Sequence, residues 1–362
     1  MKDIAAALFS HYILDGVRME GTPFSALYDC LDGNGTIDTP DRKFPDIVDE
    51  YLDKSPTTLT YDSSKVEEYL AEILRTHFDR KAVDLDYPVI WTKAAIDSLL
   101  LECLFKDGHF TLQDIMLMAI WEWHDKAPGN MAAFYDSTVA AGNHLFDLGV
   151  KLDRYFVENS WKDCTLELSV RSRMSSRRKC SATMNTGGLA DASDWIIYVP
   201  FESARLQLGG SALSKVLGQT GGAEMDLADP DYFIDCYEVV RELVEDGVVT
   251  AGASVGRGGL ITAAEKFRGR AGFSIDIAKI LSARGENDII KLLFAEMPGV
   301  LLQIKDSDYD YVDSQFLLQE VAYFPLGHPD ESMHCIRIDS NGTNSITSIL
   351  ESLLNQASEG ED

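Results

Sequence analysis

The sequence has little positive charge, few cysteines and no long apolar run. Its 362 residues carry 59 acidic and 32 basic side chains, a formal net charge of −27. This excess of acid argues against duplex DNA, RNA or an anionic membrane surface as the main partner, since each requires positive potential. No stretch approaches the ~18 apolar residues of a membrane span, and the first residues, MKDIAAALFSHYILDG, lack the pattern of a signal peptide. We therefore expect a soluble, cytoplasmic protein.

Cysteine is too sparse and too scattered for a disulfide scaffold. The six are Cys30, Cys103, Cys164, Cys180, Cys236 and Cys335, and none belongs to a C-x-x-C pair. This spacing argues against a zinc knuckle and a thioredoxin-like redox centre. His328 and His334 flank a Pro-Asp turn with no further ligand, so we expect no metal site there.

The sequence does contain enough apolar residues for an ordinary core. Hydrophobic residues make up 45% and charged residues 25%, which is typical of globular proteins, and the length predicts two or three domains. The first ~60 residues are rich in Asp, Gly, Pro and Thr and are expected to be mainly irregular. Apolar residues then recur at three- and four-residue steps from Ser63 to Phe78, which predicts a helix.

Farther along, the elements are expected to alternate. The patterns predict helices over 94–106 and 131–147, a strand that ends at Trp123, a half-exposed strand over 165–173 and a boundary loop over 174–194. Beyond that loop they predict strands at 195–201, 248–253, 272–277, 299–304, 321–325 and 334–339, and helices at 211–218, 230–246, 259–268, 287–296, 310–320 and 344–356. Such alternation indicates a layered α/β or α+β fold.

Two short motifs suggest a function, and each also has a plain structural explanation. The run from Asp32 to Asp38 resembles a calcium loop, but Cys30 and Asp41 would hold its first and last ligand positions, which favours an Asp/Gly turn. The glycine-rich stretch 252–259 joins a strand to a helix, where such loops cradle phosphates. It lacks the residues that complete a nucleotide-binding fingerprint, so a tight turn also explains it.

Two further features remain open between a site and ordinary structure. The basic cluster consists of Arg171, Arg173, Arg177, Arg178 and Lys179. It is either a phosphate or partner site or a solvated loop, and the loop is favoured. Trp121 and Trp123 share one side of a strand, which favours core packing over a stacking platform.

Several ordered motifs between residues 201 and 328 carry a resemblance to a known family. They are FESARLQLGGSALSKVLGQ, DPDYFIDCYEVVRELVEDGVVTAGASVGRGGLITAAEKF and LLFAEMPGVLLQI, and IWEWHDKAPGNMAAFYDSTVAAGNHLFDLGV precedes them. Together with VAYFPLGHP after them, they resemble phosphoribosylformylglycinamidine synthase, in the superfamily of aminoimidazole-ribonucleotide synthetase. The resemblance covers residues 90–330 and is to the second synthetase-like half of the large form of that enzyme.

The resemblance implies a two-part module. An N-terminal extension over 1–90 would precede a smaller sheet-and-helix domain over 91–175 and a larger α/β domain over 176–362. In the family the sheet of the smaller domain pairs with another such domain. The resemblance therefore implies a homodimer, or a partner protein bound through that sheet.

The resemblance implies that Mg²⁺ and ATP convert an amide to an amidine, and this sequence departs from the family at the polar and charged positions of that site. The replacements are Ile120 for an asparagine in the tryptophan-rich strand, Asn130 and Met131 at the acidic pair, Phe156 and Val157 for a lysine and an aspartate, and Ala253 and Ser254 for a His-Asp pair. The residues that remain are Gly209, Gly210, Ser211, Gly256, Gly258 and Gly259. They outline a vestigial cofactor-binding cleft.

Three hypotheses follow from this comparison of residues. The leading one is a non-catalytic structural or partner-binding relative that needs no cofactor. The second is an active ATP-dependent amidoligase subunit of purine biosynthesis, which would bind ATP or ADP with Mg²⁺ and complete its site with another chain. The third is an enzyme that uses the cleft for another phosphorylated ligand, with Arg257 or Arg154 as the cation.

Overall fold

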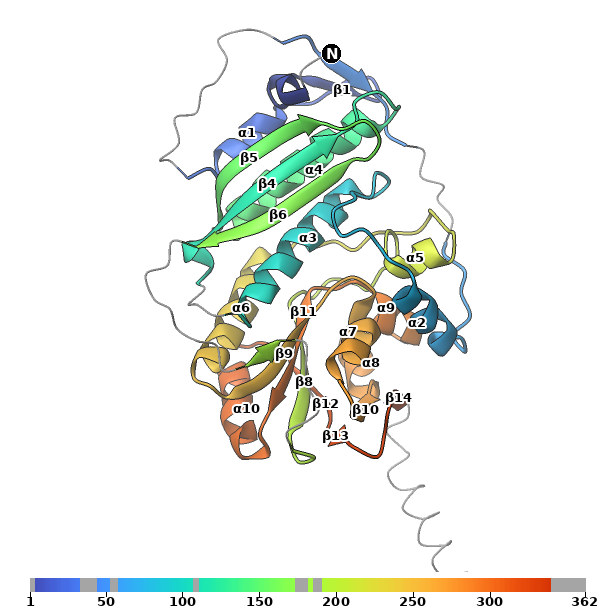
Figure 1. Ribbon diagram of the computed structural model, residues 1–362, viewed down its shortest axis with the longest axis vertical. Helices are drawn as coiled ribbons and strands as arrows, with labels where there is room; N and C mark the ends of the chain where they lie inside the picture. The colour runs from blue at the N-terminus through green and yellow to red at the C-terminus, as the bar shows by residue number, and fades with distance from the viewer. Residues whose placement is uncertain are drawn as a thin grey trace, which may run out of the picture.

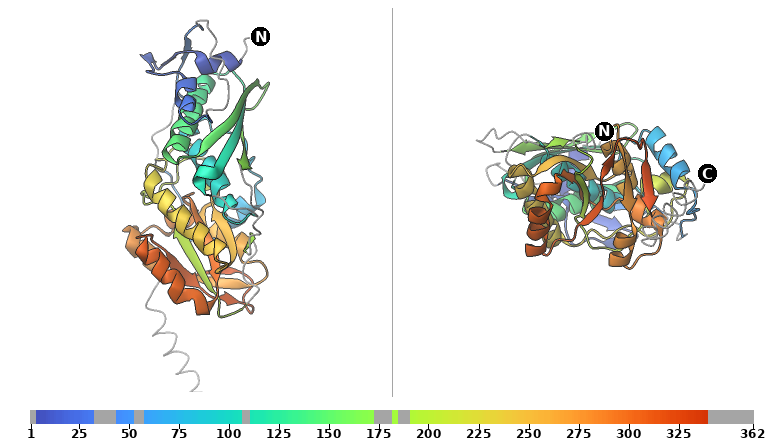
Figure 2. Two further views of the ribbon diagram at one scale, coloured as in Figure 1. Left: turned by 90° about the vertical axis from the view of Figure 1, so that its left-hand side faces the viewer. Right: turned by 90° about the horizontal axis from the view of Figure 1, so that it is seen from below.

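The described part of the chain is built around two main β-sheets. The computed structural model describes residues 4–32, 44–52, 58–106, 111–172, 182–184 and 191–339. One sheet lies in the upper half of the view in Figure 1 and the other in the lower half, with helix α3 (Pro88–Cys103) between them. Figure 2 shows the same order from the side. The fold is therefore mixed α/β, as the alternation of elements predicts.

The upper sheet has three strands and is covered by helices on one face. Its order is β5 (Lys151–Asn159), β4 (Ile115–Trp123) and β6 (Thr165–Ser172), with β4 parallel to β5 and antiparallel to β6. Alternate residues of β4 are buried, and helix α4 (Asn130–Asp147) packs on that side, where Trp121 Nε1 donates to Ser137 Oγ at 3.2 Å. The predicted core role of the tryptophans is confirmed, since Trp121 and Trp123 are both fully buried.

Strand β5 has no counterpart among the predicted elements. Only Leu152 of its nine residues is fully buried, and the others are half-buried or exposed. A strand at the edge of a sheet with a single buried residue lacks the alternation on which a sequence prediction depends.

The first sixty residues were expected to be mainly irregular, and those that are described contain five short elements joined by irregular segments. They are η1 (Ile4–Phe9), β1 (Tyr12–Leu14), β2 (Val17–Arg18), α1 (Pro23–Tyr28) and β3 (Ile47–Asp49). The physical reason is tertiary burial, because Leu8, Tyr12 and Leu27 are at most 1% exposed. Helix α1 packs against α4 so closely that a Cβ at Gly142 would lie 2.4 Å from the Ala26 carbonyl oxygen.

The central strand of the lower sheet is fully buried. Its order is β12 (Phe324–Gly327), β8 (Trp195–Pro200), β11 (Gly299–Ile304), β9 (Val249–Val255) and β7 (Thr183–Met184). Strand β11 is antiparallel to β8 and β9, and all six of its residues are buried. Its one polar side chain, Gln303, donates from Nε2 to Asp194 Oδ2 at 2.8 Å. A third, small sheet has the order β13 (Pro329–Asp330), β10 (Gly272–Asp276) and β14 (Ile336–Asp339).

Most of the predicted helices are confirmed. Besides α1, α3 and α4, the described helices are α2 (Val66–Arg75), α5 (Ala212–Val216), α6 (Pro230–Glu245), α7 (Gly259–Phe267), α8 (Ala278–Arg284), α9 (Ile289–Phe294) and α10 (Tyr309–Leu318), with the 3-10 turns η2 (Leu112–Asp114) and η3 (Asp306–Asp308). Helix α8 is not among the predicted elements, since Ile280 is its only buried residue. Helix α3 begins at Pro88, ahead of the predicted position 94, because proline is favoured in the first turn of a helix.

Two of the remaining predictions concern the C-terminal part. The strand expected at 321–325 is shifted, because the chain first turns at Glu320 (φ 55°) and pairing with β8 begins only at Phe324. The helix expected at 344–356 and most of the loop expected at 174–194 lie outside the described residues. Within the described residues no helix is both long and apolar enough to cross a membrane.

The close approach of α1 to α4 gives a stability prediction. We expect Gly142→Ala to lower the free energy of unfolding by about 1–3 kcal/mol, because the new methyl group overlaps the backbone of Ala26 and Leu27. Urea denaturation measures this change. The control is Asn143→Ala, at the next, exposed position of the helix, which should stay within about 0.5 kcal/mol of wild type. A Gly142→Ala protein as stable as wild type would contradict the packing described.

Candidate functional site

The predicted glycine-rich residues lie just before two helices of the lower half. Gly209, Gly210 and Ser211 lead into α5, and Ser211 caps that helix by accepting a hydrogen bond from Ser214 N at 3.2 Å. Gly258 and Gly259 lead into α7 with φ of 86° and 73°, values that favour glycine. The residues predicted to outline a cleft are therefore held in tight turns at two helix starts.

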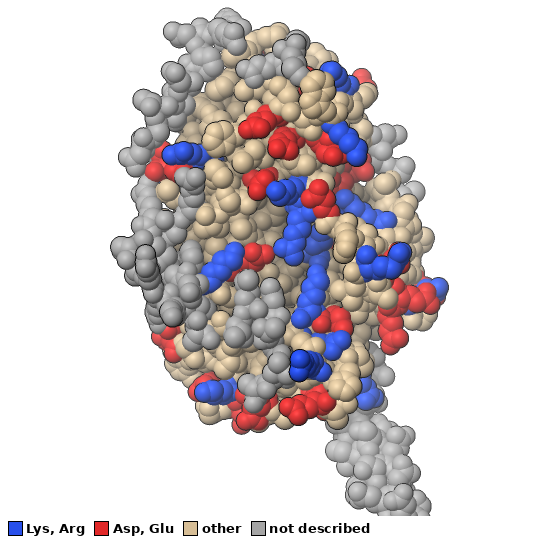
Figure 3. All heavy atoms as spheres, viewed as in Figure 1, with Lys and Arg blue, Asp and Glu red and all other residues tan. Residues whose placement is uncertain are grey.

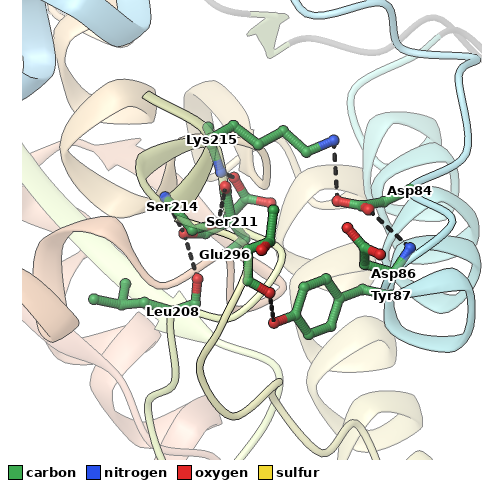
Figure 4. Close-up of polar contacts among 10 residues, drawn as sticks. Asp84, Asp86, Tyr87, Leu208, Ser211, Ser214, Lys215 and Glu296 are labelled. Atoms are coloured by element: carbon green, nitrogen blue, oxygen red, sulfur yellow. Dashed lines mark hydrogen bonds and ion pairs between the residues drawn. The ribbon is translucent and has the colours of Figure 1, made fainter. Parts of the chain in front are cut away.

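One carboxylate joins these two helix starts. Oε1 of Glu296 accepts hydrogen bonds from Ala212 N at 2.7 Å and from Gly258 N at 2.8 Å. Backbone amides at a helix N-terminus are the groups with which a protein binds phosphates. Here the chain's own carboxylate satisfies one amide of each helix start, and Figure 4 shows Glu296 beside Ser211. The sequence patterns do not reveal this contact, because 84 residues separate Glu296 from Ala212.

The segment before α3 covers the turn at Gly210. The ring of Tyr87 lies against Gly210, where an added Cβ would come within 2.9 Å of it, and its hydroxyl donates to the carbonyl oxygens of Thr220 and Gly222. Burial raises the pKa of this hydroxyl, and the nearby carboxylates of Glu224 and Asp84 add to the effect.

An ion pair also connects the segment before α3 to helix α5. Lys215 Nζ lies 3.0 Å from Oδ2 of the buried Asp84, as Figure 4 also shows. Asp84 Oδ1 accepts a hydrogen bond from Asp86 N at 3.2 Å. The ammonium group of Lys215 is therefore paired with a carboxylate of the chain itself.

The second group of predicted positions lies in the upper sheet. Ile120 pairs with Phe156 across β4 and β5, and Trp121 pairs with Val157. Phe156 is 43% exposed. Phe156 and Val157, where the resemblance implies a lysine and an aspartate, thus lie beside β4, and neither side chain carries a charge.

Asp49 closes the N-terminus of α4, next to Asn130 and Met131. Its Oδ1 accepts from Gly129 N at 3.0 Å, and its Oδ2 accepts from Met131 N at 2.9 Å and Ala132 N at 3.1 Å. A carboxylate at this end of a helix is stabilised both by the amides and by the helix dipole. Asp49 comes from strand β3 of the N-terminal extension, about which the resemblance says nothing.

The last replaced positions lie on β9. The candidate cation Arg257 follows that strand, between Gly256 and Gly258, whereas Arg154 lies on β5. Ala253 is buried and Ser254 is half-buried. The Arg257 guanidinium stacks on the Phe78 ring at 4.9 Å, and its Nε has no hydrogen-bond partner among the described residues. Arg154 is 61% exposed and its Nε lies 3.7 Å from Asp153 Oδ2.

A buried His-Asp pair between α3 and α4 was not found from the sequence. Asp97 Oδ1 lies 2.6 Å from His144 Nε2, and both side chains are almost fully buried. They line a cavity of about 10 Å³, together with Glu202 and Asp229, which has room for about one water molecule. On helices of mixed polarity these residues give no distinctive pattern. Among the described residues no group of three His, Cys, Asp or Glu side chains is placed to hold a metal ion.

The remaining motifs add no site to the described part of the chain. Cys30 is buried, its Sγ donates to Leu27 O, and burial raises the pKa of its thiol to about 12, which does not suit a calcium ligand. The rest of the calcium-like loop and the side chains of the basic cluster lie outside the described residues. The ring of His328 lies against that of Trp195, with centroids 3.9 Å apart and planes tilted by 50°, while His334 is exposed.

Comparisons with known proteins define the class. Residues 191–311 match the family model described as "AIR synthase related protein, C-terminal domain". Among solved structures, PurL of Thermotoga maritima complexed with FGAR matches with a TM-score of 0.53 at 10% identity, over 74% of this chain and 47% of that one. Phosphoribosylformylglycinamidine synthase II of the same organism matches with a TM-score of 0.50 at 11% identity, over 77% and 47%. The chain has the two-part fold of this class.

More narrowly, the chain is distantly similar to phosphoribosylformylglycinamidine synthase. It is 25% identical over 252 residues to the human enzyme, which covers 64% of this chain and 18% of the enzyme. It is 25% identical over 238 residues to the probable Arabidopsis thaliana enzyme, which covers 61% and 16%. The chain thus spans less than a fifth of the length of these relatives.

The two amides held by Glu296 give a second prediction. We expect Glu296→Ala to lower the free energy of unfolding by about 2–3 kcal/mol, because Ala212 N and Gly258 N lose their acceptor. Glu296→Gln keeps a side-chain oxygen at this place and should cost less than about 1 kcal/mol. Urea denaturation compares the two proteins, and equal losses would contradict the assigned role of the oxygen.

The contacts of Asp49 give a third prediction. We expect Asp49→Asn to destabilise the fold by about 1–2 kcal/mol, because an amide group replaces one of two oxygens that both accept backbone N–H groups. Thermal unfolding followed by circular dichroism measures the loss. Asp46→Asn is the control, since its partly exposed carboxylate lies 3.6 Å from Arg18 Nη1 in a surface ion pair. Equal melting temperatures for the two variants would count against the cap.

Proposed function

We propose that this chain is a non-catalytic, partner-binding relative of phosphoribosylformylglycinamidine synthase that pairs with a second copy through the upper sheet. The proposal includes the division of the chain into an extension over 1–90 and domains over 91–175 and 176–362. It also includes a cytoplasmic location. Three observations support it, namely the replaced charges, the cap of Asp49 and the open face of the sheet.

The replaced charges are the observation on which the proposal chiefly rests. ATP-dependent chemistry of this class requires Mg²⁺ held by carboxylates and a cation against the phosphates. Phe156 and Val157 stand where the resemblance implies a lysine and an aspartate, and Phe156 pairs with Ile120 across β5 and β4. At the start of α4 the amides that a ligand would approach already donate to Asp49. A site that lacks this lysine and aspartate, and whose helix end is occupied by Asp49, favours a structural role.

The open face of the upper sheet supports the choice of partner surface. Neighbouring residues of a strand point to opposite faces. Because Trp121 and Trp123 face α4, the half-buried Met116, Met118 and Ile120 lie on the other face, beside the exposed Phe156. In Figure 1 α4 lies behind the sheet, and none of the described helices lies in front of it. An apolar row on an uncovered sheet face is typical of a surface that packs on another protein.

Sedimentation equilibrium of the full chain tests the pairing. We expect a wild-type dimer, and we expect Phe156→Asp to weaken dimerisation at least roughly tenfold, because it places a charge beside the apolar row. The matched control is Leu318→Asp, which alters a 74% exposed leucine at the end of α10. A monomeric wild type, or equal dissociation constants for wild type and Phe156→Asp, would rule out this pairing.

A second candidate function is an active amidoligase subunit that completes its site with another chain. The observation in its favour is that both glycine turns, at Gly210 and at Gly258, still lead into helices. It predicts that adding a glutaminase and a first-half partner yields phosphoribosylformylglycinamidine from its amide. Absence of product, with the complex shown to form, would exclude it.

A further inference from the structure

The open face of the upper sheet carries charges of opposite sign at its two ends. It contains four rows, each with a residue of β4 and its partner on β5. In order along the strands, the rows are Met116 with Lys151, Met118 with Arg154, Ile120 with Phe156 and Glu122 with Glu158. Figure 3 has this face in view, and acidic side chains gather over the upper sheet toward the end to which β4 points in Figure 1. Cations therefore lie where the two strands begin, and carboxylates lie where they end.

Part of this charge is balanced within the chain. At the first end, Arg154 Nε lies 3.7 Å from Asp153 Oδ2. At the other end, Lys81 pairs with Glu167 at 2.7 Å and acts on Glu122 from farther away. These charges have neighbours of opposite sign without any second molecule.

Lys151 and Glu158 have no such neighbour. Both are exposed, and neither makes an ion pair within the residues that the structure describes. They belong to the first and the last row, which lie about 20 Å apart along the strands, so they cannot pair with each other in one copy. Glu158 also lies directly opposite Glu122, and two like charges in such a cross-strand pair repel each other. A second molecule can supply the missing partners.

A two-fold axis across the strands matches the charges of two such faces. If the axis passes between Met118 and Ile120, the facing strands are antiparallel, and the first row of each copy meets the last row of the other. Lys151 then lies against Glu158 of the second copy, twice in the dimer, and Met118 lies against Ile120. Sheets packed face to face keep their strands within about 30° of one line, so the rows remain opposite each other.

A two-fold axis along β4 brings unfavourable groups together. It places each residue of β4 against the same residue of the second copy, so Glu122 meets Glu122. It also places β5 over β6 of the second copy, so the exposed Phe156 meets Glu167. Contacts between like charges, and between a ring and a carboxylate, disfavour this arrangement.

We propose that two copies of the chain pack their upper sheets with the strands antiparallel, and that Lys151 of each copy pairs with Glu158 of the other. The partner is a second copy because both complementary charges lie on one face, as a two-fold contact requires. This inference rests on the proposed function and specifies the orientation of its pairing. The ion pairs fix the orientation, and the apolar rows between them supply the hydrophobic contact.

Sedimentation equilibrium of charge-reversal variants of the full chain tests the orientation. Lys151→Glu and Glu158→Lys should each weaken dimerisation at least roughly tenfold, because each places two like charges together at both ends of the contact. The double variant Lys151→Glu with Glu158→Lys restores opposite charges and should return to within roughly threefold of wild type. Lys305→Glu and Glu331→Lys are the controls, since they make the same changes at exposed positions of the lower half and should dimerise like wild type.

The possible failures separate this inference from the proposed function. A wild-type dimer that Phe156→Asp weakens but neither charge reversal weakens would overturn the orientation and leave the pairing intact. A double variant no stronger than the single ones would also overturn it. A monomeric wild type would overturn both. If a reversal unfolds the protein, Lys151→Gln and Glu158→Gln replace it, and each should weaken the dimer less than the corresponding reversal.

Discussion

Helix N-termini need acceptors for their free amides, and in this protein two carboxylates supply them at the positions on which the fold depends. Glu296 joins the starts of α5 and α7, so two glycine turns far apart in the sequence are held by one oxygen. Asp49 closes the start of α4 and thereby ties the N-terminal extension to the upper sheet. A buried amide without a partner costs about 1–3 kcal/mol, so these carboxylates fix the relative positions of the elements around them.

This arrangement bears on function because proteins of many folds bind phosphates at helix N-termini. A protein that turns over ATP keeps such amides for its ligand and surrounds them with cations and metal-binding carboxylates. Here Lys215 pairs with Asp84, and Phe156 and Val157 carry no charge. We therefore favour a protein that kept the fold and uses the open face of the upper sheet to bind another chain.

Much of the fold was accessible from the sequence wherever burial leaves a periodic pattern. The alternation in β4 and the apolar run of β11 predict strands because one side or both sides of each are buried. Strand β5 and helix α8 escaped prediction because each buries a single residue, Leu152 and Ile280. The glycine turns of the candidate site were predicted, whereas the contact of Glu296, the cap of Asp49 and the Asp97–His144 pair were not, since each joins residues far apart in the chain.

Calorimetric titration of the full chain with ATP and ADP, each with and without Mg²⁺, tests the central claim most directly. The claim is that the helix starts and sheet positions of this fold no longer form a nucleotide site. We expect no heat of binding up to millimolar nucleotide, because the cations and metal-binding carboxylates are missing at the positions that the resemblance implies. Micromolar binding that depends on Mg²⁺ would contradict the account.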